Sequence, residues 1–401
     1  MSGLRDCYNV EDLRQEARTR LPKWIFEFVD RGSEDDLAVS HNREAFRRLK
    51  FRNRALVDLS GRDLGTTLFG KRINAPWALA PTGAAGLCWY EGELALAKAA
   101  AAFGVPFTMA IGSTTPLEKV ADHAGGWLWF QIYIWENRNW TYELVDRAKH
   151  AGYSALVVTV DVNLGVNREF NQRNGYSNPF RPGYRTVRDI LKKPGWATSV
   201  LLRYLMTTGM PRHANNPPSA RSQHGAVLRG DNSTVVWDDL ARLRERWPHK
   251  LIVKGLTHPE DARKAVDIGA DGISVSNHGG RNFDSVAASV DCLPSIAAEV
   301  GGKTTILLDS GVRRGSDIAK GLALGANAVL LGRPMLWGIA AGGEAGALHA
   351  QKLLLREYEL TLGHLGCANA AELHPGLIVS DESLSAHRSV AGQSPAMEIV
   401  R

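Results

Sequence analysis

Short apolar runs recur along the chain at a regular spacing. Eight of them are rich in β-branched, aromatic or other apolar residues and end in polar or glycine residues, a pattern typical of buried strands. They are Pro76–Pro81, Pro106–Ala110, Trp127–Tyr133, Ala155–Asp161, Leu251–Gly255, Gly272–Asn277, Thr305–Gly311 and Ala328–Gly332. Near-continuous apolar strands predict a parallel sheet that is covered on both faces.

Helical patterns rich in Ala, Leu, Lys and Glu lie between these runs. The clearest are Gly92–Phe103, Thr141–Ala151, Pro259–Ile268 and Gly315–Leu324. Alternation of strand and helix predicts parallel pairing with the helices packed outside. A doubly wound open sheet shows the same local pattern, but eight strands and the polar residues at their ends favour a closed TIM (β/α)8 barrel.

Two segments fall outside this repeat, within what we interpret as a single barrel domain spanning residues 1–401. Residues 1–50 are charged and helical in pattern, with Pro22 near the start of a helix, and they predict an N-terminal helical cap. Residues 176–233 follow the fourth strand as a long insertion that contains no strand and helix of normal length.

The insertion is strongly basic. Nine Lys and Arg residues against two Asp residues give it a net charge of +7, whereas the whole chain carries +6. Within it, Trp196–Met206 is apolar and is flanked by Lys192, Lys193 and Arg212. This composition is typical of a segment that lies on an anionic membrane surface. A lid over the active site or an oligomer contact is the alternative, and both interpretations stay open.

Composition narrows the class of protein. The chain has 401 residues, of which 44% are hydrophobic and 22% are charged, as in globular proteins. The four cysteines form no CxxC pair, which argues for a reducing compartment and against a metal site or disulfide framework. We read no secretory signal and no membrane-spanning run, so we expect a cytoplasmic protein, with the insertion as its one candidate contact with the inner face of the membrane. The mild positive charge suits an anionic substrate or phosphate cofactor and does not call for nucleic acid.

In a barrel of this kind the active site lies at the carboxyl ends of the strands. The residues found there, or just beyond, form one polar set: Pro81, Thr82, Gly83, Ser113, Gln131, Tyr133, Thr159, Asp161, Lys254, His278, Arg281, Asp309, Arg313, Gly332 and Arg333. The set combines a base, carboxylates, cations and glycines.

The run SNHGGR, Ser276–Arg281, has the most specific pattern. His278 is a candidate general base because the ordinary histidine pKa lies near working pH. Asp161 could orient its imidazole, as the carboxylate does in a hydrolase triad. Arg168 and Arg281 would supply two planar forks for a substrate carboxylate.

A second run, Leu308–Asp317, and the LGRP sequence after the eighth strand combine glycines with arginines. Gly311 and Gly332 let backbone amides approach a ligand, and Arg313 and Arg333 stand beside them. The pattern predicts a phosphate site after the seventh and eighth strands.

These motifs resemble those of the FMN-dependent 2-hydroxy-acid-oxidising family, which includes glycolate oxidase, flavin lactate dehydrogenase and mandelate dehydrogenase. The resemblance rests on LPKWIFEF, APTGAAG, WFQIY, TVD, LIVKGL, SNHGGR, DSGVRRGSD and LLGRP, in this order from about Tyr8 to Gly366. Within the family the motifs are most similar to those of the mandelate dehydrogenase branch.

The resemblance implies FMN at the barrel mouth. Its phosphate would be held by Arg313, Gly332 and Arg333, and Asp309 would bind the ribityl chain. Contacts to its ring would come from Pro81, Thr82, Gly83, Ser113, Gln131, Thr159, Lys254 and Ser276. Lys254 would stabilise the negative charge that arrives at the N1/C2 edge on reduction.

The implied reaction converts a 2-hydroxy acid to a 2-oxo acid. His278 would remove a proton while two electrons pass to the flavin, by a carbanion or a hydride route. Tyr133 would hydrogen-bond the substrate, and Arg168 and Arg281 would hold its carboxylate. The electron acceptor would be a quinone or oxygen, and tetramers are expected by analogy. The intact polar set disfavours an isomerase-like FMN barrel or a non-catalytic one.

Three positions bear on substrate and acceptor. Phe26 matches a family tyrosine that hydrogen-bonds the substrate carboxylate, so that donor is missing here. Gly83 resembles the glycine of membrane-linked dehydrogenases, which favours a quinone acceptor. Ala110–Ser113 lacks the tryptophan of glycolate oxidase, which predicts a roomier pocket for an aromatic or branched side chain such as that of mandelate, although lactate also fits.

Overall fold

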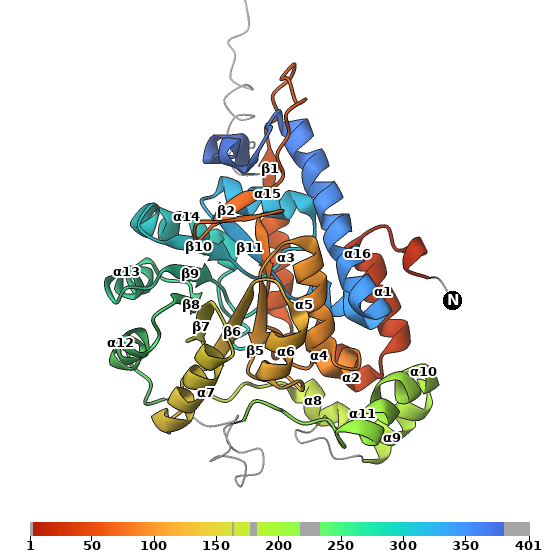
Figure 1. Cartoon of the computed structure of the whole chain (residues 1–401). Coiled ribbons are helices and arrows are strands. Elements are labelled where there is room, and N and C mark those ends of the chain that lie inside the picture. The colour runs from red at the N-terminus through yellow and green to blue at the C-terminus, as the bar shows by residue number, and fades with distance from the viewer. Residues whose placement is uncertain (1–2, 163, 177–182, 217–232, 381–401) are drawn as a thin grey trace, which may run out of the picture.

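The computed structural model describes residues 3–162, 164–176, 183–216 and 233–380, and in them a closed barrel of eight parallel strands forms the core (Figure 1). The strands are β4 Trp77–Leu79, β5 Phe107–Ala110, β6 Leu128–Tyr133, β7 Ala155–Thr159, β8 Lys250–Leu256, β9 Gly272–Val275, β10 Thr305–Leu308 and β11 Ala328–Leu331. β11 pairs with β4 and closes the ring, with Val329 opposite Trp77. The predicted TIM barrel is confirmed, and each predicted strand is present. Most strands end before their polar residues, which leave the sheet to line its mouth.

Helices cover the outside of the barrel (Figure 1). They are α5 Gly92–Phe103, α6 Leu117–Ala124, α7 Arg138–His150, α12 Trp237–Arg246, α13 Pro259–Asp267, α14 Ser289–Val300, α15 Gly315–Ala323 and α16 Arg333–Leu365. α7 begins three residues before the predicted Thr141 because Asn137 caps it, accepting a hydrogen bond from the N–H of Asn139 at 3.2 Å. α5 ends at Gly104, whose φ of +83° and close approach to Asn74 require glycine.

A hairpin closes the amino-terminal end of the barrel. It consists of β2 Thr66–Leu68 and β3 Lys71–Ile73. Between them, Phe69 packs edge-on against Trp127 and Trp129, with ring centroids 6.4 and 5.8 Å apart. This apolar plug seals the end opposite the predicted site.

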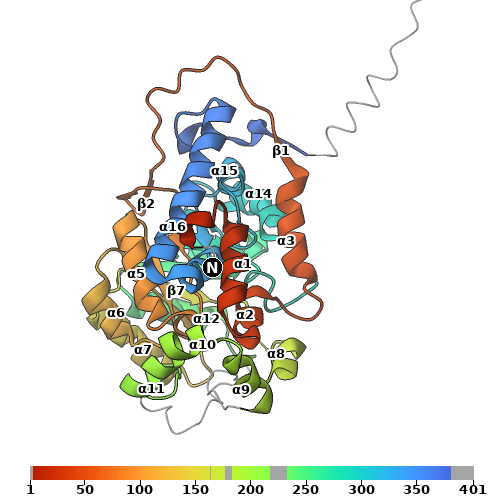
Figure 2. The ribbon, with the colours of Figure 1, turned by 90° about the vertical axis from the view of Figure 1, so that its right-hand side faces the viewer.

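Three helices precede the barrel: α1 Val10–Arg20, α2 Lys23–Asp30 and α3 Leu37–Arg48. α1 lies along α16, as Figures 1 and 2 both show. α2 begins directly after Pro22 and buries Trp24 and Ile25, so its carboxyl end is held near the barrel mouth. The short strand β1 Leu49–Phe51 follows α3 and pairs with β12 Ile378–Ser380, and the one-turn helix α4 Ala85–Cys88 follows β4.

The described part of the insertion after β7 is largely helical. It contains α9 Tyr184–Leu191, α10 Pro194–Trp196, the π-helical turn η2 Ala197–Leu202 and α11 Arg203–Thr207. α8 Glu169–Asn174 directly precedes the insertion, and Figure 2 shows all these helices together at the bottom of the molecule. The indole N–H of Trp196 donates to the Leu87 carbonyl at 2.7 Å. Three predicted basic residues of the insertion, Arg181, Arg221 and Arg229, lie outside the described residues. No helix in the described ranges is both long and apolar enough to span a membrane.

Candidate active site

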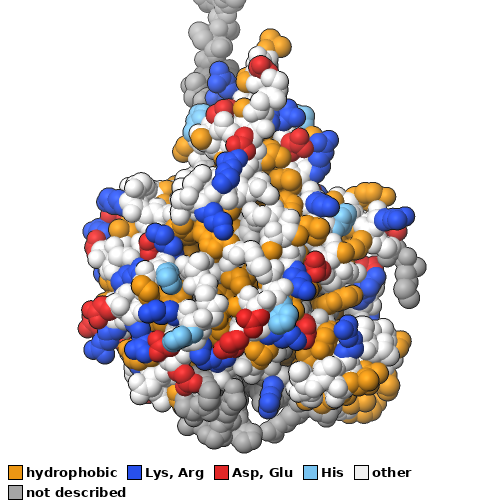
Figure 3. Space-filling view, viewed as in Figure 1, with side chains coloured by type: hydrophobic (Ala, Val, Ile, Leu, Met, Phe, Trp, Pro, Cys, Tyr) orange, Lys and Arg blue, Asp and Glu red, His pale blue; other side chains and the backbone are white. Residues whose placement is uncertain are grey.

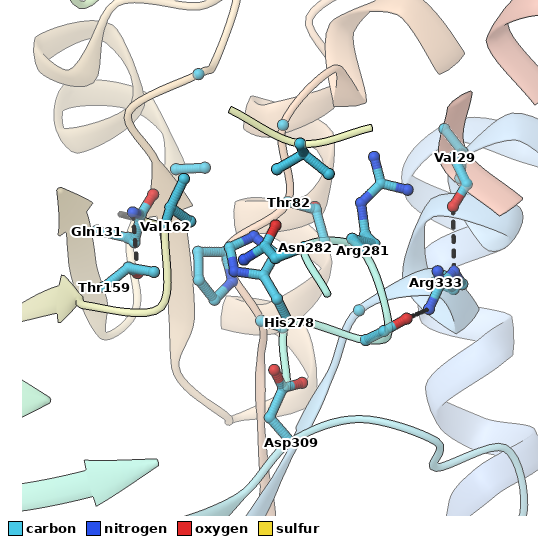
Figure 4. A pocket seen from close by; sticks show the side chains of 18 of the residues that line it. Val29, Thr82, Gln131, Thr159, Val162, His278, Arg281, Asn282, Asp309 and Arg333 are labelled. Atoms are coloured by element: carbon cyan, nitrogen blue, oxygen red, sulfur yellow. Dashed lines mark hydrogen bonds between the residues drawn. The ribbon is translucent and has the colours of Figure 1, made fainter. Parts of the chain in front are cut away.

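A cavity of about 640 Å³ opens at the carboxyl ends of the strands, and each of the eight strands, or the loop that follows it, contributes to its wall. Fifteen predicted site residues line it: Pro81, Thr82, Gly83, Gln131, Tyr133, Thr159, Arg168, Lys254, His278, Arg281, Asp309, Gly311, Arg313, Gly332 and Arg333. Figure 4 shows His278 at the centre, the hydrogen-bonded pair Gln131 and Thr159 on one side, and Arg281 and Arg333 on the other.

His278 stands in a strained turn directly beyond β9. Its φ of +58° lies in the left-handed region, and its backbone N–H donates to the Ser276 hydroxyl at 3.0 Å. Its Nδ1 is 2.9 Å from the Asp161 carboxylate, which fixes the tautomer that leaves Nε2 unprotonated. Burial lowers the pKa of His278, and the Asp161 charge only partly restores it. The imidazole is therefore neutral at neutral pH and able to accept a proton.

Asp161 is held by its surroundings. Gly255 passes so close that a Cβ atom there would lie 2.7 Å from both Cβ and Cγ of Asp161. The Asn282 amide donates to the Asp161 carbonyl at 3.0 Å. The second carboxylate oxygen of Asp161 is buried and has no hydrogen-bond partner among the described residues. This carboxylate is thus committed to His278.

Lys254 and Asp309 form a buried ion pair at the floor of the cavity. The Lys254 ammonium lies 2.8 Å from Asp309 Oδ2 and 2.9 Å from the Ser276 hydroxyl, which itself donates to Asp309 at 2.6 Å. Burial alone would lower the pKa of Lys254, but the Asp309 and Asp161 charges outweigh it and the pKa is raised. Lys254 therefore stays protonated beneath the cavity, with its charge paired with that of Asp309.

Arg168 and Arg281 are braced by backbone carbonyls. Arg168 donates twice to the Arg281 carbonyl, at 3.1 and 2.7 Å. Arg281 donates to the carbonyls of Phe28 and Arg31 at the end of α2, at 2.7 and 2.8 Å, and lies over the Phe28 ring. Burial and then the charge of Arg168 hold the pKa of Arg281 well below its usual range. Two guanidinium groups so close together favour a bound anion.

Arg313 and Arg333 form a second cationic pair beside β10 and β11. Arg333 donates to the carbonyls of Val29, Gly279 and Arg31, and Arg313 lies over the Trp337 ring. Burial lowers the pKa of both, and their mutual repulsion adds to this for Arg313. In the described part of the chain, no carboxylate forms an ion pair with any of the four cavity arginines. A cavity with this unneutralised charge fits a phosphorylated cofactor together with a carboxylate substrate.

Four predicted site residues do not line the cavity. Asp161 and Ser276 lie behind the cavity wall, where they form hydrogen bonds with His278 and Asp309, which do line the cavity. Ser113 turns inward and donates to the Ala110 carbonyl at 2.5 Å. Phe26 packs into the core at 8% exposure, whereas Phe28 lines the cavity. This corrects the expectation for Phe26: two helical positions are about 200° apart around the axis, so only one of the two phenylalanines faces the mouth.

The sequence patterns did not point to several of the residues that line the cavity. These include Phe28, Trp135, Tyr176, His213 and Asn282. Tyr176 stacks on Phe28 with ring centroids 4.4 Å apart, which closes one side of the mouth. Asn282 directly follows SNHGGR and could have been found from that position. His213 lies in the insertion, where no strand pattern points to the site.

Comparison with known proteins defines the class to which this fold and site belong. The family model of the FMN-dependent dehydrogenases matches residues 17–380, so the chain belongs to that family. It is an FMN-dependent 2-hydroxy acid dehydrogenase or oxidase, as the motifs predicted, and its cofactor is FMN.

Individual relatives show which members of the family the chain is similar to. The chain is 39% identical to (S)-mandelate dehydrogenase of Pseudomonas putida over 94% of its own length and 95% of that protein, and 37% identical to an L-lactate oxidase of Nostoc over 93% and 98%. A crystal structure of (S)-mandelate dehydrogenase, described as a monotopic membrane protein, superimposes with a TM-score of 0.88 at 38% identity, covering 94% of this chain and all of that one.

Proposed function

We propose that this enzyme oxidises an (S)-2-hydroxy acid with an aromatic or branched side chain to the corresponding 2-oxo acid. The observation that carries the proposal is the convergence of the His278–Asp161 pair and two unneutralised arginines on one cavity. A proton acceptor and a carboxylate fork are what such an oxidation requires of the protein.

His278 acts as the general base. Its lowered pKa keeps it neutral before the reaction, and Asp161 stabilises the imidazolium that forms when it takes the substrate proton. Tyr133 lines the same cavity and, because burial raises its pKa, it stays a hydroxyl donor for the substrate oxygen.

Arg168 and Arg281 hold the substrate carboxylate. Their guanidinium groups are anchored on one edge by carbonyls, so their orientation is fixed before substrate arrives. Placement of the carboxylate there brings the neighbouring carbon and hydroxyl to His278, which is three residues from Arg281 in the sequence.

The FMN site is assigned to the floor of the cavity, with its Lys254–Asp309 pair, and to the arginine-lined rim. Arg313, Gly332 and Arg333 would hold its phosphate, Asp309 its ribityl chain, and Lys254 the N1/C2 edge of its ring. When bound, FMN supplies the acceptor for two electrons. Gln131, Thr159, Pro81, Thr82 and Gly83 would surround the ring.

The side-chain pocket favours a large acid. Gly112 follows β5 and lines the cavity without a side chain of its own. The ring of His213 occupies only part of the space beside Gly112, and we propose a mandelate-like acid rather than lactate as the substrate; the two relatives described above include an enzyme named for each of these acids.

A quinone acceptor and peripheral membrane contact are proposed together. Large apolar side chains are exposed on the insertion, among them Tyr184, Leu191, Leu205 and Met206, and Lys192 and Lys193 join two of its helices. Figure 3 shows hydrophobic side chains gathered at the lower right, over α9 to α11. Quinones dissolve in lipid, so an enzyme that rests on the membrane would meet this acceptor there.

An anaerobic screen tests the function. The purified protein with FMN is mixed with glycolate, lactate, mandelate and longer (S)-2-hydroxy acids, and the flavin absorbance is followed. Bleaching with aromatic or branched acids is expected, faster than with glycolate. Bound flavin that none of these acids bleaches would instead favour another FMN-barrel chemistry or a non-catalytic role.

A further inference from the structure

His213 belongs to the insertion, far in sequence from the barrel strands that it faces, yet its ring lines the cavity. A Cβ atom built on Gly112 would lie 3.4 Å from Cε1 and 3.6 Å from Nδ1 of His213, and 3.9 Å from the Cα of Gly83. The imidazole therefore occupies part of the space that a side chain at position 112 would fill. The roomier pocket expected around Ala110–Ser113 is therefore bounded on this side by His213, which comes from a distant part of the chain.

The backbone that follows this histidine is fixed to the loop after β5. The N–H of Ala214 donates to the Ser113 carbonyl at 2.9 Å. The fully buried Asn215 accepts from the N–H of Leu117 at 2.8 Å and donates to the Thr115 carbonyl at 3.1 Å. These three hydrogen bonds place the imidazole before any ligand binds, as a specificity residue requires.

The imidazole carries unused hydrogen-bonding capacity. Nδ1 of His213 is sealed against the Gly112 backbone, so the ring nitrogen left for a ligand in the cavity is Nε2, to which no described residue forms a hydrogen bond. Burial lowers the pKa of His213, and a hydrogen bond with the Gly112 backbone opposes this to a smaller extent, so the ring is neutral and has one donor and one acceptor nitrogen. A ligand group that pairs with Nε2 inside the cavity gains affinity, whereas an apolar side chain leaves this nitrogen without a partner.

The position of His213 in the ring of strands indicates which part of the substrate it meets. β5 and β9 are four strands apart in the closed ring of eight, on opposite sides of the barrel. His278 and Arg281 follow β9, whereas His213 stands over the end of β5. A 2-hydroxy acid whose carboxylate lies at Arg281 extends its side chain away from β9, toward His213.

We propose that His213 is a specificity-determining residue, which contacts the substrate side chain and selects 2-hydroxy acids that carry a hydrogen-bonding group there, such as a ring hydroxyl. The inference rests on the proposed function, because it takes the carboxylate to lie between Arg168 and Arg281. It adds a substrate class to that function: hydroxylated aromatic acids over the unsubstituted ones.

The test compares binding of product-like acids to the oxidised, FMN-loaded enzyme by titration calorimetry. The probes are benzoylformate and its 3-hydroxy and 4-hydroxy derivatives. The wild-type enzyme is expected to bind at least one hydroxylated acid about tenfold more tightly than benzoylformate, the gain typical of pairing a buried polar group. His213→Phe keeps a flat ring without nitrogens and should bring this ratio close to one.

A matched control is His150→Phe, which changes an exposed histidine at the end of α7 that bonds only its own helix. It should leave the ratio at the wild-type value. Equal binding of all three acids by the wild-type enzyme, a preference that persists in His213→Phe, or binding of none of the acids would each overturn the assignment.

Binding and turnover separate the two proposals. A wild-type enzyme that shows the His213-dependent preference but is not reduced by any 2-hydroxy acid would keep the role of His213 and reject the oxidation. An enzyme that is reduced by mandelate but shows no such preference would keep the oxidation and reject the role of His213.

Discussion

At the scale of single residues, the proposed chemistry depends on the imidazole of His278, whose surroundings are arranged in advance. Asp161 fixes its tautomer, burial keeps it neutral, and a left-handed turn holds it at the end of β9. None of these three effects needs the substrate. His278 is therefore neutral and oriented before any ligand binds, as the proposed general base must be.

Replacement of this base should separate cofactor binding from chemistry. His278→Ala is expected to retain FMN, because Arg313, Arg333 and Lys254 are unchanged, and to reduce the rate of anaerobic flavin bleaching by about 10²–10⁴. Stopped-flow absorbance measures the rate, and the visible spectrum reports the cofactor. A variant that bleaches at the wild-type rate would exclude His278 as the base.

The pH dependence follows from the pKa of His278. The base acts unprotonated and its pKa lies below the ordinary value, so kcat/KM should fall only as pH drops below about 6.5. Asp161→Asn removes a charge that raises this pKa, so the acid limb should move to still lower pH while kcat falls on the order of 10². An acid limb that stays in place or moves upward in the variant would show that another group titrates.

Gly255 supports Asp161 by having no side chain. Gly255→Ala should destabilise the fold by more than the roughly 1–2 kcal/mol of left-handed strain, because its Cβ also meets Asp161. Gly152→Ala is the control: its φ is +79° but a Cβ there meets nothing within 4 Å, so it should show strain alone. Urea unfolding measures both, and an equal loss in the two variants would contradict the steric account.

At the scale of elements, the continuous helical stretch of the insertion formed by α10, η2 and α11 has two different faces. Trp196, Val200 and Tyr204 are buried against the barrel, whereas Leu205 and Met206 are 49% and 76% exposed. The hydroxyl of Tyr204 accepts a hydrogen bond from the N–H of Glu91 at 3.1 Å, which joins this helix to the start of α5. One face is structural, and the other is free to meet a surface.

Charged substitutions on the exposed face should weaken membrane binding. Leu205→Asp combined with Met206→Asp is expected to reduce affinity for vesicles that contain anionic lipid by at least about tenfold, since each large side chain transferred from water contributes about 1.5–3 kcal/mol. Co-sedimentation measures this. Leu56→Asp, at a fully exposed leucine outside the insertion, should leave binding unchanged, and equal retention of vesicles by all three proteins would rule out this contact surface.

The carboxyl end of α2 contributes to the cavity through its backbone carbonyls. Backbone carbonyls of Phe28, Val29 and Arg31 accept hydrogen bonds from Arg281 and Arg333. Carbonyls at a helix carboxyl end carry partial negative charge, which steadies these guanidinium groups without cancelling their charge as a carboxylate would. Sequence patterns report side chains, so this contact was not predictable from them.

At the scale of the whole molecule, the N-terminal helices and the barrel meet around the cavity to which we assign FMN. Arg333 is the first residue of α16. Its guanidinium donates to the carbonyls of Val29 and Arg31 at the end of α2 and to the carbonyl of Gly279 in the loop after β9. Ligand binding in this cavity therefore stabilises contacts between distant parts of the chain.

FMN should stabilise the folded protein in proportion to its affinity. At 100 times its dissociation constant, FMN should raise the free energy of unfolding by about 2.7 kcal/mol. Arg313→Met should weaken FMN binding about tenfold to 150-fold, the effect of one charge-assisted hydrogen bond of about 1.5–3 kcal/mol. Flavin fluorescence titration measures the affinity. Arg72→Met, at an exposed arginine outside the cavity, is the control and should leave the affinity unchanged. An unchanged affinity in Arg313→Met would place the phosphate elsewhere.

The sequence by itself determined the barrel and most of its chemical groups. Apolar runs of strand length alternating with helices specify parallel strands, and strand ends in a closed barrel converge, so His278, Lys254 and Arg333 could be placed together from their positions alone. Contacts between distant segments were decided only by the tertiary structure. His213, Phe28 rather than Phe26, and the carbonyls of α2 reach the cavity because the insertion and the N-terminal helices pack over the barrel mouth, and no local periodicity encodes how such segments pack.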